Sequence, residues 1–260
     1  MTTGYLTITQ DDAVTVVTLN RADKRNCINE DMLEEIDAVF RKPPAGTRCF
    51  VLAAMGAHFC AGLDLREHFD KDRSPVEFMR VCNNWHKAFD QIQFGGIPVV
   101  AALQGAVVGG GLELAAATHV RIADPSTFFA LPEGQRGIFT GGGATVRVAR
   151  IITPARMVDM MLAARTYDAQ RGFDLGLAHE VVGAGEALGR ALALAREIAK
   201  HPPMTNFAIT TGIARINDMS STDGLFAEGL LQAAVQTNPD IKLRLAAFFG
   251  GETKRLEPGA

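Results

Sequence analysis

The sequence has few aromatic residues and no apolar run long enough to cross a membrane. Aromatic side chains make up 7% of the 260 residues, with one Trp and two Tyr, so a stacking platform for single-stranded nucleic acid is not expected. The apolar runs are all shorter than the roughly 20 residues of a membrane-spanning helix. The N-terminal segment MTTGYLTITQ also has no apolar signal region. We therefore expect neither a nucleic-acid partner nor a membrane partner.

An excess of positive charge and paired cysteines are also absent. The 26 Lys and Arg against 29 Asp and Glu give a net charge of −3, which provides no general attraction for nucleic acid or an anionic lipid surface. The four cysteines form no CxxC pair, so we interpret them as reduced thiols in a cytoplasmic protein. A hydrophobic content of 47% is typical of one large globular domain with or without a small appendage.

Several motifs that carry well-known chemistry are missing. The sequence contains no GxSxG elbow, no HExxH and no GxGxxG, and its six histidines lack the spacing of metal ligands. Gly105 and Gly110 have the spacing of a P-loop, but Gly111 and Leu112 follow instead of Lys and Ser or Thr. We therefore expect no bound metal, no nucleotide site of these types and no redox cofactor.

The apolar pattern divides the chain into a mixed β/α part and a mostly helical part. YLTIT and AVTVVTL alternate around two aspartates, which predicts a β-hairpin. Asn29 and Ser74 predict the starts of two helices, and 49–54 and 98–103 are predicted strands. The helix after Ser74 is expected to bury Phe78, Val81, Trp85, Phe89 and Ile92. From about residue 144 the pattern is helical, with AHEVV as the one expected strand.

Two glycine loops follow predicted strands. GAVVGGGLELAAA (105–117) leads from one strand into a helix that begins near Gly110, where unpaired N–H groups and positive partial charge favour an anion. Tight packing of the helix on the sheet would also explain these glycines. HFCAGLDLREH (58–68) brings the N–H of Leu63 to the same edge, unless it is an ordinary connection. Cys60 has no base near it in the sequence, so we interpret it as a small buried residue.

Two carboxylates accompany these loops. Glu113 lies among Leu112, Leu114 and alanines, a setting that penalises a charge unless other groups share it. Glu133 follows Pro132 at the end of a predicted strand. Converging N–H groups from two strand ends are typical of an oxyanion hole, and two carboxylates at one apolar pocket can divide the roles of acid and base.

Five segments in this order resemble the crotonase superfamily, the enoyl-CoA hydratase/isomerase group: NRADKRNCIN, FCAGLDL, GAVVGGGLELA, FALPEGQRGI and GGGATVRVARIIT. The resemblance implies an α/β fold, a crotonase-like ββα superhelical spiral core over residues 1–190, with a C-terminal helical trimerisation region over residues 191–260. It implies an acyl-coenzyme A thioester as the ligand, with coenzyme A as part of the substrate and no separate cofactor. The assembly it implies is a homotrimer or a dimer of trimers.

The resemblance also implies the site residues. Leu63 and Gly110 stand at the two oxyanion-hole positions, and Glu113 and Glu133 stand where hydratases carry their catalytic glutamates. The implied coenzyme A contacts are Lys24, Arg25, Cys27, Ala61, Gly62, Leu63, Asp64, Leu65 and Arg66. These residues predict an enoyl-CoA hydratase that adds water across the 2,3 double bond. The alternatives are a Δ3-Δ2 enoyl-CoA isomerase, another acyl-CoA reaction, or a non-catalytic, RNA-associated trimeric scaffold.

The sequence departs from the family pattern at three places. Ala22 replaces a usual proline, His119 replaces a usual aspartate, and GIFTGGGATVRV replaces a loop that usually contains proline and glutamine. We expect His119 to affect packing rather than chemistry. Phe139 and Thr140 fall near the acyl pocket of the family, so these departures concern the acyl group, which the sequence does not identify.

Overall fold

The structure is a computed structural model that describes residues 4–251. The chain forms two compact units, residues 1–200 and 201–260. The boundary expected at residue 190 lies within helix α8 (Ala187–Ala199), and the whole of this helix belongs to the first unit.

A six-stranded sheet forms the centre of the first unit, in the order β1-β2-β3-β4-β6-β9. The expected hairpin is confirmed as the antiparallel pair β1 and β2, and every later pair in this sheet is parallel. The predicted strand over 49–54 is confirmed as β3, and the one over 98–103 as β4. The strands are β1 (Leu6–Asp11), β2 (Val14–Leu19), β3 (Cys49–Ala54), β4 (Val99–Leu103), β6 (Val120–Ala123) and β9 (Glu180–Val181).

A second, three-stranded sheet contains two strands that the sequence pattern did not predict. It consists of β5 (Ala106–Val108), β7 (Phe128–Ala130) and β8 (Thr166–Asp168). The residues before the helix expected near Gly110 were predicted to form a loop, but three of them, Ala106–Val108, pair with β7 as β5. Both missed strands are three residues long, and such strands depend on a partner distant in the sequence rather than on a local pattern.

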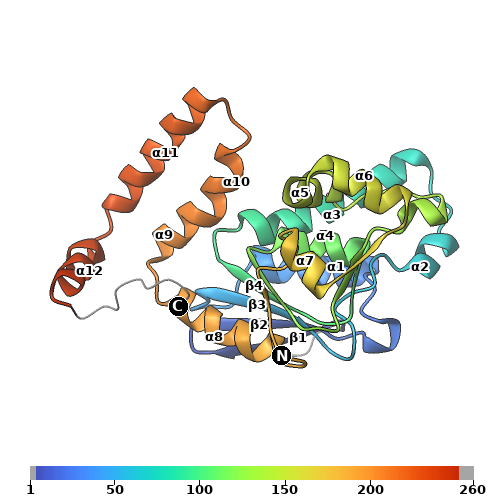
Figure 1. Cartoon of the computed structure of the whole chain (residues 1–260), viewed down its shortest axis with the longest axis horizontal. Coiled ribbons are helices and arrows are strands. Elements are labelled where there is room, and N and C mark those ends of the chain that lie inside the picture. Colours follow the sequence, from blue (N-terminus) through green and yellow to red (C-terminus); the bar gives the residue numbers. More distant parts are fainter. Residues whose placement is uncertain (1–3, 252–260) are drawn as a thin grey trace. The chain divides into compact units, whose positions relative to one another are not determined.

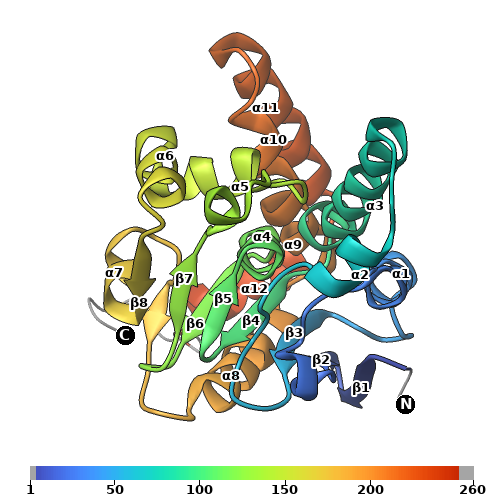
Figure 2. The ribbon, with the colours of Figure 1, turned by 90° about the vertical axis from the view of Figure 1, so that its right-hand side faces the viewer.

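Alternating side chains place two apolar layers on opposite faces of the large sheet. Val51, Val100 and Ala102 pack with the alanines of α8 on one face. Phe50, Leu52 and Ala101 face the larger core beneath the other helices. Figure 2 shows α8 on one side of the strands and α1 and α4 on the other. Those helices are α1 (Glu30–Arg41), α3 (Pro75–Phe94), α4 (Gly110–Ala117), α5 (Ala144–Ile152), α6 (Pro154–Leu162) and α7 (Ala169–Asp174).

Helix α3 has one side packed in the hydrophobic core and another side that faces a cavity. Its start is fixed by the expected capping box, in which Ser74 and Glu77 bond reciprocally. Trp85, Phe89 and Ile92 are buried as predicted. Phe78 and Val81 are only half-buried, because they line a cavity instead of the core. Periodicity shows which side chains face inward, but it cannot distinguish a packed core from a cavity wall.

The described part of the second unit, residues 201–251, is mostly helical. It contains α9 (Pro203–Phe207), a π-helical turn η3 (Ala208–Gly212), α10 (Ile213–Ile216), α11 (Ser221–Gln236) and α12 (Asp240–Phe249) (Figure 1). Large apolar side chains on these helices are exposed, among them Phe207, Leu225, Phe226 and Leu230. Across residues 4–251, no helix has both the length and the apolar content needed to span a membrane.

His119 joins strand β4 to helix α3. Its Nδ1 accepts the N–H of Val99 at 3.0 Å, and its Nε2 donates to the carbonyl of Gln93 at 3.1 Å. A proton on Nδ1 would face the Val99 N–H, so the ring must be neutral here. Burial lowers the pKa of His119 to about 4. The side chain does not line the cavity beside Phe78 and Val81, which agrees with the packing role expected for it.

The free energy of unfolding is expected to fall as the pH drops from about 6.5 to about 4, because only the unfolded chain then readily protonates His119. The loss should be about 1–3 kcal/mol. His119→Asn keeps an acceptor near Nδ1 and cannot gain charge, so its urea midpoint should vary less with pH. His179, whose pKa is also lowered to about 4, leaves a residual dependence. Identical pH slopes for both proteins would contradict this assignment.

Candidate active site

One cavity of about 430 Å³ in the first unit collects most of the residues that the sequence singled out. Its walls are the loop 61–65, the start of α4, one side of α3 and the segment 132–142. Glu113, Glu133, Leu63 and Gly110 all line it. Segments distant in the sequence therefore meet at one place, as expected for the ends of neighbouring strands.

The loop after β3 presents the N–H of Leu63 to this cavity. Ile28 bonds to both neighbours of Leu63, donating to the Gly62 carbonyl at 2.7 Å and accepting the Asp64 N–H at 2.9 Å. In such a parallel bridge the N–H of the central residue points away from the bridging partner. The N–H of Leu63 is thus free of Ile28 and faces the cavity side of the loop.

The N–H of Gly110 lies beside that of Leu63. Gly110 is the first residue of α4, so its N–H has no partner within the helix. A methyl group added at Gly110 would lie 3.3 Å from the nitrogen of Leu63 and 2.6 Å from the ring of Trp85. A methyl group at Gly62 would lie 3.0 Å from the nitrogen of Gly110. The N–H groups of Leu63 and Gly110 are therefore neighbours, and two neighbouring N–H donors can stabilise an oxygen atom that gains negative charge.

Glu113 receives backbone donors despite its apolar surroundings. Its side chain begins one turn inside α4, and the residue is 3% exposed. Oε1 accepts the N–H of Gly142 at 2.9 Å and that of Ala144 at 3.0 Å. Burial raises the pKa of Glu113 to about 7, the two N–H groups oppose this rise, and the charge of Glu133 adds to it. The carboxyl group can therefore hold or release a proton near neutral pH.

Glu133 is the second buried carboxyl group of the cavity. It is 7% exposed and begins the short helix η2 (Glu133–Arg136) after strand β7. Within residues 4–251, nothing forms a hydrogen bond with its Oε2. Burial raises the pKa of Glu133, which favours the protonated form. A methyl group added at Gly109 would lie 2.9 Å from its Oε1, so Gly109 leaves the space in which this carboxyl group lies.

In the sequence, the segment 141–144 belongs both to a motif that resembles the family and to a loop that departs from the family pattern, but no role at the site was predicted for it. Its function at the site is to supply both N–H groups that Glu113 accepts. A methyl group at Gly142 would lie 2.6 Å from Oε2 of Glu113 and 2.9 Å from Trp85. The three glycines directly before a predicted helix were the available signal, since they mark a close approach of backbone to another group.

The residues expected to contact coenzyme A occupy two kinds of position. Ala61, Gly62, Leu63 and Leu65 line the cavity. The others do not line it, and they are Lys24, Arg25, Cys27, Asp64 and Arg66. The two groups are linked, because the N–H of Ala61 donates to the carbonyl of Arg25 at 3.0 Å. Lys24 and Arg25 are exposed cations beside the cavity loop.

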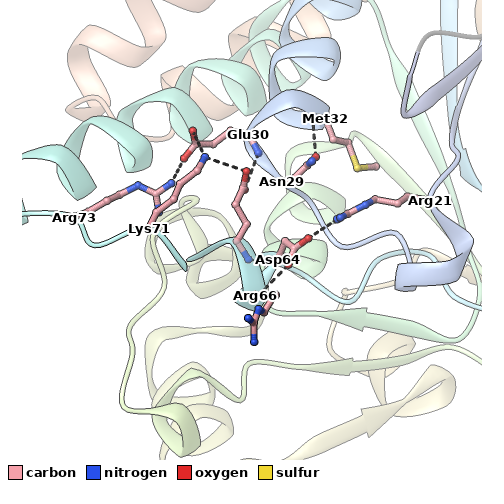
Figure 3. A network of polar contacts seen from close by, with 9 residues as sticks. Arg21, Asn29, Glu30, Met32, Asp64, Arg66, Lys71 and Arg73 are labelled. Carbon is pink, nitrogen blue, oxygen red and sulfur yellow. Dashed lines mark hydrogen bonds and ion pairs between the residues drawn. The ribbon is translucent and has the colours of Figure 1, made fainter. Parts of the chain in front are cut away.

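Asp64 has structural partners that the sequence did not indicate. Its carboxylate forms an ion pair with Arg21 at 2.7 Å. It also accepts the N–H groups of Arg66 and Glu67, and these bonds cap the start of helix α2 (Leu65–Asp70). Figure 3 shows Asp64 between Arg21 and Arg66, with a second ion-pair group at Glu30, Lys71 and Arg73. These contacts lower the pKa of Asp64 against the effect of burial. They hold the loop that carries Leu63.

Cys60 is a buried structural residue, as interpreted from the sequence. It is fully buried, and burial raises the pKa of its thiol to about 12, so no thiolate forms near neutral pH. Its backbone pairs with both ends of β5, which joins the cavity loop to the second sheet. No group of three or more His, Cys, Asp or Glu side chains in residues 4–251 is arranged to hold a metal ion.

Comparison with known proteins places this geometry in a family. Residues 9–254 match the family model for enoyl-CoA hydratase/isomerase. The chain belongs to this family. A mitochondrial protein of Arabidopsis thaliana, named probable enoyl-CoA hydratase 2, is 31% identical over 245 residues, which are 92% of this chain and 79% of the relative. The enzymes of the family act on acyl-coenzyme A thioesters.

Solved structures confirm the fold expected from the resemblance. A Rhodopseudomonas palustris structure assigned as an enoyl-CoA hydratase is 40% identical, with a TM-score of 0.91 and 95% of each chain covered. The enoyl-CoA hydratase of Bacillus anthracis is 26% identical, with a TM-score of 0.89, covering 98% of this chain and 100% of that one. The α/β crotonase fold with C-terminal helices is therefore shown for this chain.

Proposed function

We propose that this protein is an enoyl-CoA hydratase, which adds water reversibly across the 2,3 double bond of an enoyl-CoA thioester. The observation that carries the proposal is a pair of buried carboxyl groups, Glu113 and Glu133, on one cavity with two converging backbone N–H groups. Hydration needs all of these parts, because it requires an oxygen ligand, a base for water and an acid for carbon.

The thioester oxygen accepts the N–H groups of Leu63 and Gly110. These donors stabilise the negative charge that develops on this oxygen, so the β-carbon becomes electrophilic. Glu113 takes a proton from water as the water oxygen bonds to the β-carbon. Glu133 gives a proton to the α-carbon, and the two carboxyl groups then return to their first protonation states by exchange with solvent.

The surroundings of the two carboxyl groups support this division of roles. Glu113 accepts two N–H groups, and such donors favour its ionised form. Glu133 is buried with an oxygen that lacks a donor in the described part of the chain, which favours its protonated form. The pair interacts electrostatically, so each titration depends on the other.

The coenzyme A part of the substrate is proposed to follow the loop 61–66 and to reach 24–27. Lys24 and Arg25 are exposed there and carry the positive charge that phosphate groups favour. No metal or separate cofactor is part of the proposal. The four cysteines are free thiols, and a cytoplasmic location belongs to the proposal.

The family includes isomerases, so a Δ3-Δ2 enoyl-CoA isomerase is the second candidate. That reaction moves one proton between two carbons and needs one carboxyl group. The second buried carboxyl group on the same cavity favours hydration. A non-catalytic, RNA-associated scaffold has no use for either carboxyl group.

The oxyanion hole is tested at Leu63. Leu63→Pro removes the N–H, whereas Leu63→Ala keeps it. Loss of one such donor should lower the turnover of an enoyl-CoA thioester by about 10²–10³-fold, and the alanine variant should lose far less. Binding of an acyl-CoA to both variants controls for distortion of the loop. Equal losses of turnover in two variants that bind alike would exclude the Leu63 N–H as a donor.

The two carboxyl groups are tested by Glu113→Gln and Glu133→Gln. Each variant should lose about 10²–10⁴-fold in hydration and still bind acyl-CoA, because each removes one proton transfer and keeps the shape. The double variant should lose much less than the product of the single losses, because both groups act on one reaction step. Hydration is followed by the loss of enoyl thioester absorbance.

The results separate the candidate functions. An isomerase that uses one carboxyl group would keep most of its activity in one single variant. A scaffold would show no loss of absorbance even as the unchanged protein. Near-normal hydration by Glu133→Gln would refute the mechanism with two glutamates while leaving the family assignment in place.

We also propose a homotrimer or a dimer of trimers. The exposed apolar side chains of the second unit form a surface of the kind that marks a protein interface. Light scattering at micromolar concentration should give three or six times the chain mass of 27.9 kDa. Leu225→Glu with Phe226→Glu should lower the oligomer fraction. A stable monomer of the unchanged protein would contradict the proposal.

A further inference from the structure

Arg147 of helix α5 is a buried cation outside the cavity. The residue is 8% exposed and is not among those that line the cavity. Each nitrogen of its guanidinium has a partner. Nη2 pairs with Asp90 at 2.6 Å, Nε donates to the side chain of Gln93 at 2.7 Å, and Nη1 donates to the carbonyl of Gly142 at 3.1 Å.

The carbonyl of Gly142, which accepts Nη1 of Arg147, belongs to the segment that donates hydrogen bonds to Glu113. It lies in the chain between the N–H of Gly142 and the N–H of Ala144, and Oε1 of Glu113 accepts both. The intervening Gly143 has φ +107°, and a side chain there would collide with Nη1 of Arg147. The backbone turn is therefore pressed against the guanidinium on one side and bonded to the carboxylate on the other.

The anchors of Arg147 lie on the helix that also forms the cavity wall. Asp90 and Gln93 belong to α3, and a methyl group added at Gly110 or Gly142 would collide with Trp85 of the same helix. The carbonyl of Gln93 also accepts a hydrogen bond from Nε2 of His119. Arg147 thus links the turn 142–144, which leads into α5, to helix α3, which forms one wall of the cavity.

The positive charge of Arg147 favours the ionised form of Glu113, as do the N–H groups of Gly142 and Ala144. It lowers the pKa of Glu113 against the effect of burial. Glu133 raises the pKa of Glu113, and Glu113 in turn raises that of the Cys82 thiol. Asp90 and Arg150 are the other charged groups that influence Arg147. Arg147 is the cation in this set that favours an ionised Glu113.

We propose that Arg147 is a positioning residue for the reaction, which holds the turn at 142–144 so that its two N–H groups reach Glu113 and keep that carboxyl group ionised. The proposal rests on the proposed function, in which ionised Glu113 is the base for water. A guanidinium serves this purpose better than an ammonium, because it bonds to three fixed partners in one plane.

The test compares Arg147→Met, Arg147→Lys and Asp90→Asn, with Arg156→Gln on the exposed side of α6 as the control. Infrared titration of the protein against Glu113→Gln isolates the protonated and ionised bands of the Glu113 carboxyl group. Arg147→Met should raise the pKa of Glu113 by at least one pH unit. Arg147→Lys should raise it less because it keeps the positive charge. Asp90→Asn should also raise it less, because the loss of a negative charge partly opposes the effect of a loosened turn, and Arg156→Gln should leave it unchanged.

The kinetic readout is the pH profile of hydration. At pH 7 Arg147→Met should lose at least about fivefold in kcat/KM, which follows the ionisation of the free enzyme, because a rise of one pH unit from a pKa of about 7 removes most of the ionised Glu113. The loss should shrink as the pH rises, and KM should change little because Arg147 does not line the cavity. Arg147→Lys should restore the pH profile more than the absolute rate.

The outcomes are distinguishable from failure of the proposed function. An unchanged infrared titration in a folded Arg147→Met protein overturns the positioning role, whatever the enzyme catalyses. If Arg147→Met does not fold, an unchanged titration in a folded Arg147→Lys protein overturns it. A shifted titration in a protein without hydratase activity supports the positioning role and contradicts the proposed function.

Discussion

The burial of the Glu113 carboxyl group is the constraint on which the other parts of the site depend. A carboxyl group 3% exposed among leucines and alanines must find donors within the protein, and the donors come from the start of another helix. The remaining opposition to ionisation leaves its pKa at about 7. Burial thus produces both the structural need for the turn at 142–144 and a group able to exchange protons near neutral pH.

Close approach of backbone explains the glycines around this carboxyl group. A methyl group at Gly110 would occupy the space beside the Leu63 nitrogen, and one at Gly142 would collide with Glu113. The loop that carries Leu63 is in turn held by Asp64 and Arg21 and by the bridge to Ile28 (Figure 3). The reacting groups therefore lie on segments fixed by backbone bonds and buried ion pairs, which keeps the geometry ready before a substrate binds.

Features with a local cause were predictable from the sequence. The hairpin, the strand Cys49–Ala54 and the caps at Asn29 and Ser74 were found because their signals lie within a few residues. Glu113, Glu133, Leu63 and Gly110 were found through motifs, and they meet at one cavity. The strands β5 and β8, the donors at 142–144 and the partners of Asp64 were missed, because each depends on a contact between segments far apart in the chain.

The proposed hydration of an enoyl-CoA thioester requires two buried carboxyl groups and two N–H groups to act together. The most direct measurement incubates the protein with a trans-2-enoyl-CoA in water labelled with both deuterium and ¹⁸O and determines the mass of the product. The expected product is a 3-hydroxyacyl-CoA with one ¹⁸O on the β-carbon and one deuterium on the α-carbon. Recovery of enoyl-CoA alone, with or without deuterium and without any hydrated product, would contradict the proposed hydration.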